Sequence, residues 1–167
     1  MSLKFTANYF TKLYDFTAYK VRNSVEVSLG KFFRRSIKNP LDINNENGIQ
    51  GFRADSLAGD SRLRARFQAI VFTNWKLIGF NFAVVPQLDL AVLAQRNETL
   101  FSGSLFQGYS LGLRTRNENL IFNTVEMRGY FFPSTVENVN QYRITISASL
   151  RIKYPTTLVR APDTIFN

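Results

Sequence analysis

The stretch RLRARF at residues 62–67 alternates strictly between arginine and an apolar side chain. Successive side chains of a β-strand point to opposite faces, so this pattern places the arginines on one face and the apolar residues on the other. The same period of two returns in residues 19–33 and 142–154, where valine, leucine and isoleucine interleave with polar residues. We therefore predict strands over 19–33, 62–77 and 142–154.

Shorter alternating segments fill most of the remaining chain. They begin near Leu3, Phe80 and Tyr109, and they are separated by clusters rich in Gly, Asn and Pro such as KNPLDINNENG. No segment shows a convincing helical period. The sequence thus predicts seven or eight strands in a single all-β domain that covers residues 1–167 without an internal boundary.

Two kinds of all-β protein produce such alternation: soluble barrels or sandwiches, and transmembrane barrels with lipid outside and a polar lumen. The three long predicted strands exceed the roughly 9–11 residues that a membrane-spanning strand needs. Aromatic residues near the ends of the apolar runs resemble the interfacial girdles of membrane barrels; these residues are Trp75, Tyr130, Tyr142 and Tyr154. The pattern favours an antiparallel transmembrane β-barrel. A soluble lipid-binding barrel of the lipocalin type needs an apolar interior, which the arginine-rich face argues against.

The barrel hypothesis assigns a direction to each face. An arginine at the bilayer midplane costs about 2–4 kcal/mol in such barrels, so the charged residues are expected in the lumen. The predicted lumen lining consists of Arg62, Arg64, Arg66, Arg114, Arg116, Glu126 and Arg128. We also expect Arg143 and Arg151 to point inward. The residues expected to face lipid are Leu63, Phe67, Val71, Ile144, Ile146 and Leu150.

Composition excludes several classes of function. The 21 Lys and Arg residues against 12 Asp and Glu give a formal charge of +9, a balance that often signals nucleic acid or an anionic membrane surface. Because the arginines fall on the face opposite the aromatic residues, no nucleic-acid partner is expected. The chain has no His and no Cys, which removes the usual general base and thiolate ligands. No nucleotide-binding or metal-ligand motif occurs. We therefore expect no catalytic residue, no metal and no cofactor, and a protein that is not an enzyme.

Five stretches together resemble a known family. They are GFRADSLAGD, PQLDLAVL, YSLGLRTRNENLIF, VEMRGYFFP and QYRITISASLRIKY, and they resemble the C-terminal half of BamA-like outer-membrane barrels, the superfamily of β-barrel assembly factors and two-partner secretion transporters. The resemblance covers nearly the whole chain from about Gly48. It implies a sixteen-stranded barrel in the bacterial outer membrane, of which this chain supplies part.

The resemblance also implies a function and partners. Family members insert outer-membrane proteins or translocate proteins without covalent chemistry. The partners it implies are outer-membrane lipid and lipopolysaccharide, substrate β-strands, and periplasmic or lipoprotein subunits. The seam between the first and last strands would admit a substrate strand by β-augmentation.

The sharpest element of the resemblance is a loop motif that folds back into the lumen. The family motif is an Arg-Gly pair flanked by an aliphatic and an aromatic residue. We assign it to Gly51, Phe52 and Arg53, with Ala54 where glycine is expected. In the family an inward acidic residue of a following strand holds the motif arginine, and Asp89 matches that position, with a leucine after it in place of the small family residue. The resemblance therefore implies an ion pair between Arg53 and Asp89.

Two alternatives stay open at this stage. The chain can be a fragment of a larger barrel, or its strands can close as a small structural or passive-pore barrel. The opening residues MSLKFTANYF enter the strand pattern almost at once, which favours the fragment, and no signal peptide is visible in them. No run approaches the roughly 20 apolar residues of a membrane-spanning helix.

Overall fold

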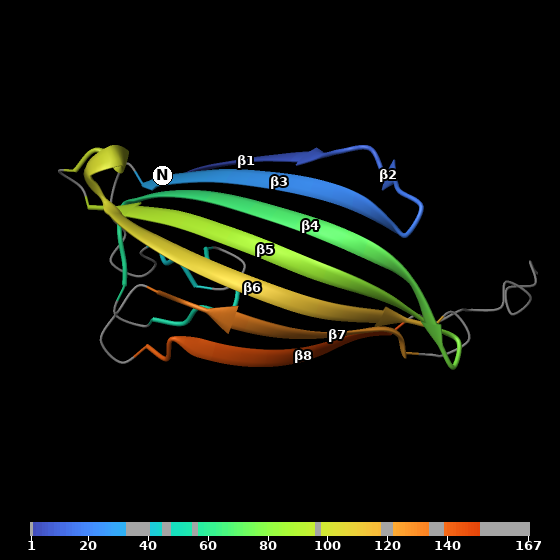
Figure 1. Cartoon of the computed structure of the whole chain (residues 1–167). Helices are drawn as coiled ribbons and strands as arrows, with labels where there is room; N and C mark the ends of the chain where they lie inside the picture. The colour runs from blue at the N-terminus through green and yellow to red at the C-terminus, as the bar shows by residue number, and fades with distance from the viewer. Residues whose placement is uncertain are drawn as a thin grey trace, which may run out of the picture.

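One open, antiparallel β-sheet makes up the computed structural model of the chain (Figure 1). The structure describes residues 2–32, 41–44, 48–54, 57–95, 98–117, 122–133 and 139–150. Eight strands belong to the sheet, which confirms the predicted all-β class and strand number. The sheet is not closed into a barrel within these residues. None of them forms a helix long and apolar enough to cross a membrane.

The strands follow one another in chain order across the sheet. Their bounds are β1 Ser2–Phe10, β2 Tyr14–Asp15, β3 Tyr19–Phe32, β4 Ser61–Leu77, β5 Phe80–Ala94, β6 Ser104–Arg116, β7 Phe122–Phe131 and β8 Tyr142–Leu150, with a short 3-10 turn at Leu100–Ser102. The order across the sheet is β1-β3-β4-β5-β6-β7-β8, and β2 pairs with β3 beyond the end of β1. Every neighbouring pair is antiparallel. The two outermost strands, β1 and β8, therefore run in the same direction.

The predicted strand boundaries hold to within a residue where the structure can test them. Strands β3 and β4 match the predicted 19–33 and 62–77, and β8 is described as far as Leu150. Residues 151–154 of the last predicted strand lie outside the described residues, and with them Arg151 and Tyr154. A two-residue turn joins β4 to β5, and both of its residues have positive φ, 48° at Ile78 and 77° at Gly79. This is the backbone that a tight hairpin turn of the primed type requires.

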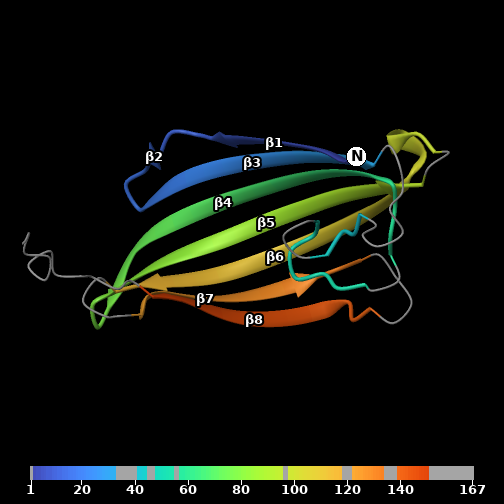
Figure 2. The ribbon, with the colours of Figure 1, turned by 180° about the vertical axis from the view of Figure 1, so that it is seen from behind.

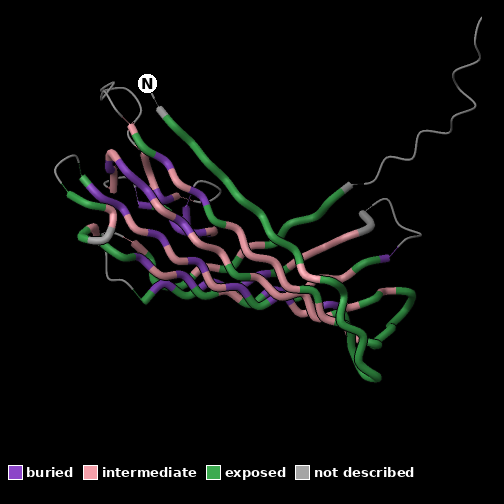
Figure 3. The backbone as a smooth tube through the Cα atoms, turned by 90° about the horizontal axis from the view of Figure 1, so that it is seen from above, coloured by how far each residue is buried: buried purple, intermediate pink, exposed green. Residues whose placement is uncertain are grey.

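The connection between β3 and β4 folds back over one face of the sheet (Figure 2). We call residues 41–60 the β3–β4 loop, of which 41–44, 48–54 and 57–60 are described. The sheet face beneath it is the loop face, and the opposite one is the open face. Figure 3 shows buried residues concentrated in the loop and the central strands, whereas β1, next to the marked N-terminus, is exposed along its length.

The two faces differ in charge as the alternation predicts. Arg62, Arg64 and Arg128 are each 3% exposed on the loop face. On the open face, no charged residue occupies β4 between Ser61 and Phe72 or any position of β5 to β8. Large apolar side chains are exposed there instead, among them Phe67, Leu105, Leu111, Met127, Ile144 and Ile146. The separation into a charged and an apolar face is thus confirmed, while contact of the open face with lipid stays a prediction.

Candidate functional site

The β3–β4 loop is closed by its own hydrogen bonds. Leu41 and Gly59 exchange backbone bonds where the loop leaves and rejoins the sheet, and the N–H of Ile49 donates to the carbonyl of Ile43 at 2.9 Å. The side chain of Asn44 bonds both backbone groups of Ala54, accepting from its N–H at 2.8 Å and donating to its carbonyl at 3.3 Å. These bonds satisfy backbone groups that the sheet ladder does not reach.

An apolar side of the loop packs on the sheet. Its buried residues cluster with apolar residues of β5, β6 and β7; the cluster comprises Ile43, Ile49, Phe52, Ala54, Ala91, Leu93, Phe106, Tyr130 and Phe132. Phe52 is 1% exposed and its ring meets that of Phe132 edge-on, with 5.3 Å between the ring centroids. Strand β6 makes room for the loop at Gly108, where a Cβ atom would stand 2.4 Å from Cγ2 of Ile49. The loop and the sheet are therefore complementary in shape.

Arginines of the sheet bind the loop's backbone carbonyls. Arg62 donates to the carbonyl of Asp42, Arg66 to that of Gly48 at 3.4 Å, and Arg143 to that of Gly51 at 3.0 Å. The donors stand on β4 and β8, at widely separated places in the sheet. Charged donors make stronger bonds than neutral ones, so these contacts fix the loop at several points.

Asp89 of β5 is the acidic centre of the site. It is 2% exposed, and one carboxylate oxygen accepts from Nε of Arg66 at 2.6 Å. The other oxygen accepts from the amide nitrogen of the Gln87 side chain at 2.7 Å and from the backbone N–H of Gln50 at 3.2 Å. This carboxylate thus joins a sheet arginine to the loop backbone.

Gln50 of the loop makes a second connection through its side chain. Its carbonyl oxygen accepts from the Gln87 amide at 3.0 Å and from Arg128 at 3.5 Å. Arg128 in turn donates from Nε to Glu126 at 2.7 Å, and Glu126 also accepts from Nε of Arg114 at 2.7 Å. A continuous polar network therefore extends from the loop across β5, β6 and β7.

Glu26 of β3 extends the same network on the other side. It forms an ion pair with Arg64 and lies 3.7 Å from Arg66. Each carboxylate of the network, at Glu26, Asp89 and Glu126, is engaged by at least one arginine. The arrangement holds a loop in place, and it leaves none of these carboxylates as a free general base. No group of three or more potential metal ligands exists among the described residues.

The expected pair between Arg53 and Asp89 is wrong. Arg53 is exposed, and the arginine that binds Asp89 is Arg66. The reason lies in the alternation of the loop, because Phe52 and Ala54 are buried in the apolar cluster and Arg53 between them is exposed. Gly51 and Phe52, the two residues before it, are buried.

Gln50 is the residue of this site that the sequence interpretation missed. The motif order of aliphatic residue, arginine, glycine and aromatic residue is matched by the run from Ile49 to Phe52, with Gln50 in the place of arginine. Because the motif carries an arginine, the sequence alone favours Arg53 over Gln50 for this position. The neighbouring Gly51 and Phe52 in the correct order were the signal that could have located it.

Tyr130 is not an interfacial aromatic on the outside of the sheet. It is 6% exposed on the loop face, and its ring lies directly against Gly51. Strand alternation explains this, because Tyr130 is two residues from Arg128 and must share its face. Trp75 and Tyr142 are 73% and 71% exposed, and their position at a membrane boundary stays a prediction.

The remaining predicted lining residues all belong to the loop face. Arg62 and Arg64 are buried, and the side chains of Arg66 and Glu126 are 17% and 13% exposed. Arg116, at the end of β6, is exposed. The structure thus brings Arg62, Arg64, Arg66, Arg114, Glu126 and Arg128 into contact with the loop or its polar network.

Comparisons with protein families, with curated proteins and with solved structures find no match to this chain.

Proposed function

We propose that this chain forms part of the wall of a bacterial outer-membrane β-barrel of the BamA-like type, which inserts or translocates proteins without covalent chemistry. The observation that carries the proposal is the two-faced sheet. One face presents apolar side chains without charge from β4 to β8, and the other carries the arginines and a loop bound to them. Lipid suits the first face and an aqueous lumen suits the second.

The bound loop supports the finer assignment to the BamA-like type. In that family a loop folds into the lumen and an inward acidic residue holds it. The β3–β4 loop and Asp89 are related in this way, with Gln50 at the motif position. The partners that follow from the proposal are outer-membrane lipid, lipopolysaccharide, substrate strands and periplasmic or lipoprotein subunits.

The edges of the sheet favour a large barrel over a small one. Unpaired backbone groups cost several kcal/mol each in hydrocarbon, so β1 and β8 both need further strands beside them. Because β1 and β8 run in the same direction, closing them on each other would require one parallel pair in an antiparallel sheet. The small structural or passive-pore barrel is therefore the less favoured alternative.

Spin labels on adjacent residues of β8 test the membrane assignment. The chain has no native cysteine, so Ile146→Cys and Ser147→Cys each provide a single labelling site. In lipid vesicles, the label at residue 146 is expected to be reached by oxygen and protected from a water-soluble relaxation agent, and the label at residue 147 is expected to show the reverse. Equal access of the water-soluble agent to both labels would contradict a lipid-facing open face.

A folding assay tests the assignment to protein insertion. The full-length protein in phospholipid vesicles is expected to accelerate the folding of an added, urea-unfolded outer-membrane barrel protein. Asp89→Ala is expected to reduce the acceleration, because the loop loses its acidic anchor, whereas Arg53→Ala leaves it unchanged. Ion conductance across the vesicles without any acceleration would support the passive-pore alternative instead.

A further inference from the structure

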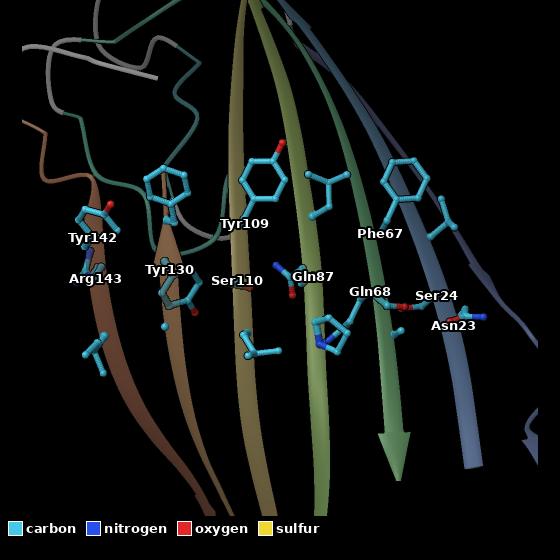
Figure 4. A pocket seen from close by; sticks show the side chains of 18 residues that line it. Asn23, Ser24, Phe67, Gln68, Gln87, Tyr109, Ser110, Tyr130, Tyr142 and Arg143 are labelled. Atoms are coloured by element: carbon cyan, nitrogen blue, oxygen red, sulfur yellow. The ribbon is translucent and has the colours of Figure 1, made fainter. Parts of the chain in front are cut away.

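A groove of about 860 Å³ crosses the open face (Figure 4). It is lined by three consecutive residues from each of β3 to β8. The middle residues form a single register row, which is Ser24, Gln68, Gln87, Ser110, Tyr130 and Arg143. The side chains of this row point to the loop face, so their backbone is the floor of the groove. The groove therefore runs straight across the strands.

Large side chains form one wall of the groove. The register row on that side contains Phe67, Leu88, Tyr109, Phe131 and Tyr142. Tyr109 stacks on Phe131 with 6.5 Å between ring centroids, and Phe131 stacks on Tyr142 at 5.1 Å. This continuous aromatic ridge fixes the edge of the groove over three strands.

The row on the other side has small residues on β4, β5 and β7, together with the larger Leu111 on β6 and Ile144 on β8. The opposite row includes Ala69, Pro86 and Gly129, and a Cβ added at Gly129 would meet no atom within 4 Å. Proline is rarely found in the interior of a sheet because it cannot donate to the ladder, yet Pro86 lies in β5 between two paired strands. A compact ring at this position leaves space above the backbone that a longer side chain would occupy.

The groove is wide enough for a single hydrocarbon chain and longer than the depth of one leaflet. Neighbouring strands lie about 4.8 Å apart, so six strands give a length of about 24 Å, and alternate residues along a strand give a width of about 7 Å. Each leaflet of a bilayer supplies acyl chains that extend through half of a hydrocarbon core about 30 Å thick. One acyl chain therefore fits the groove lengthwise.

The lining chemistry favours a lipid chain over a protein segment. Among the open-face residues of the groove, the polar side chains are Asn23 and the two tyrosines, and the hydroxyl of Tyr109 already bonds Gln107 at 3.1 Å. A protein interface ordinarily carries about one hydrogen bond per 100–200 Å² together with a polar rim. The groove offers few such partners, and it is continuous with an apolar face that lacks charged residues from β4 to β8.

We propose that this groove is a binding site for one acyl chain of a membrane phospholipid, held across the strands rather than along them. The inference rests on the proposed membrane location of the open face. Because barrel strands tilt about 35–45° from the barrel axis, a chain in this groove lies oblique to the surrounding lipid. The site is thereby distinct from the general lipid coat of a barrel.

Native mass spectrometry of the full-length protein in detergent tests the site with phosphatidylcholine as the probe. Long-chain phosphatidylcholine is expected to form one saturable adduct, and short-chain phosphatidylcholine with the same headgroup to bind much more weakly. Ala69→Leu combined with Gly129→Leu fills the groove and is expected to weaken the adduct roughly tenfold or more, since two lost methylene contacts account for that factor. Ala65→Leu, on the open face of β4 but outside the groove, is the matched control and keeps the adduct.

Each other outcome overturns the inference in an identifiable way. Equal, unsaturable lipid binding by all variants would mean a general lipid coat without a site, and it would leave the membrane assignment intact. A second copy of the chain in place of lipid would make the groove a protein interface. Failure of the wild-type protein to enter vesicles in the spin-label experiment would instead overturn the proposed function itself. The Cβ of Gly129→Leu meets no atom within 4 Å, so this single variant separates loss of binding from loss of folding.

Discussion

Replacing Asp89 by alanine is expected to lower the free energy of unfolding by about 3–5 kcal/mol, the range found when one partner of a buried ion pair is removed. Asp89 is 2% exposed and accepts bonds from Arg66, Gln87 and the backbone of Gln50. Its removal leaves the loop N–H without its acceptor and leaves Arg66 with the Gly48 carbonyl at 3.4 Å and the Glu26 carboxylate at 3.7 Å. Urea unfolding of the full chain in detergent micelles measures the change.

Arg53→Ala is the matched control for this experiment. Arg53 lies in the same loop but is exposed, so its replacement is expected to change stability by less than about 0.5 kcal/mol. A double-mutant cycle with Asp89→Ala and Arg66→Ala is expected to show an interaction of about 0.5–3 kcal/mol. Strictly additive losses would mean that Asp89 and Arg66 do not interact. A large loss in Arg53→Ala would restore the pair implied by the family resemblance.

Strand positions and faces could be predicted because they depend on local alternation. In β4 each arginine is separated from the next by one apolar residue, so a single assumption about the period fixes both the strand and its two faces. The same rule corrects the one misplaced aromatic, since Tyr130 shares the phase of Arg128. Its aromatic ring suggested a membrane boundary for Tyr130. The alternation of side chains along the strand, however, decides which face a residue occupies.

The partner of Asp89 could not be predicted because it depends on register. If the β4–β5 pairing continued from the turn without an irregularity, Arg66 would lie opposite Ala91. An irregularity between Phe72 and Lys76 shifts the pairing by two residues and brings Arg66 opposite Asp89. Bulges of this kind have no clear sequence signal. The shift preserves the faces, which is why the charged face was predicted correctly and the partner of Asp89 was not.

The course of the β3–β4 loop is likewise set by contacts distant in sequence. Gln50 reaches Gln87 and Arg128, which follow it by 37 and 78 residues. No local pattern in KNPLDINNENG predicts these contacts. Asp42 supplies one of the bound carbonyls, but nothing in the neighbouring sequence distinguishes it from an ordinary loop residue. The family resemblance implied a contact between Arg53 and Asp89, whereas the loop residue that meets Asp89 in the structure is Gln50.

Replacing Gly51 by alanine is expected to release the loop from the sheet. Gly51 has a φ of 79°, a conformation that costs an alanine about 1–2 kcal/mol. Its added Cβ would stand 2.9 Å from ring atoms of Tyr130, and overpacking of this kind costs about a further 1–3 kcal/mol. The carbonyl of Gly51 also accepts the bond from Arg143, so a shift of the backbone that relieves the clash would weaken this contact. Unfolding in urea and the rate of proteolytic cleavage within the loop are the measurements.

Two further variants separate the conformational cost from the steric one. Gly129→Ala serves as the control, because its Cβ meets no atom within 4 Å, and it is expected to leave stability and loop cleavage nearly unchanged. Tyr130→Ala removes the ring that the new methyl group would strike, so the double variant Gly51→Ala, Tyr130→Ala is expected to lose less stability than the sum of the two single losses. The difference between that sum and the loss measured for the double variant should equal the overpacking cost alone. The cost of positive φ remains, because position 51 is still an alanine. Fully additive losses would show that the ring of Tyr130 does not restrict the space at position 51. The loop would then not depend on this sheet residue for its position.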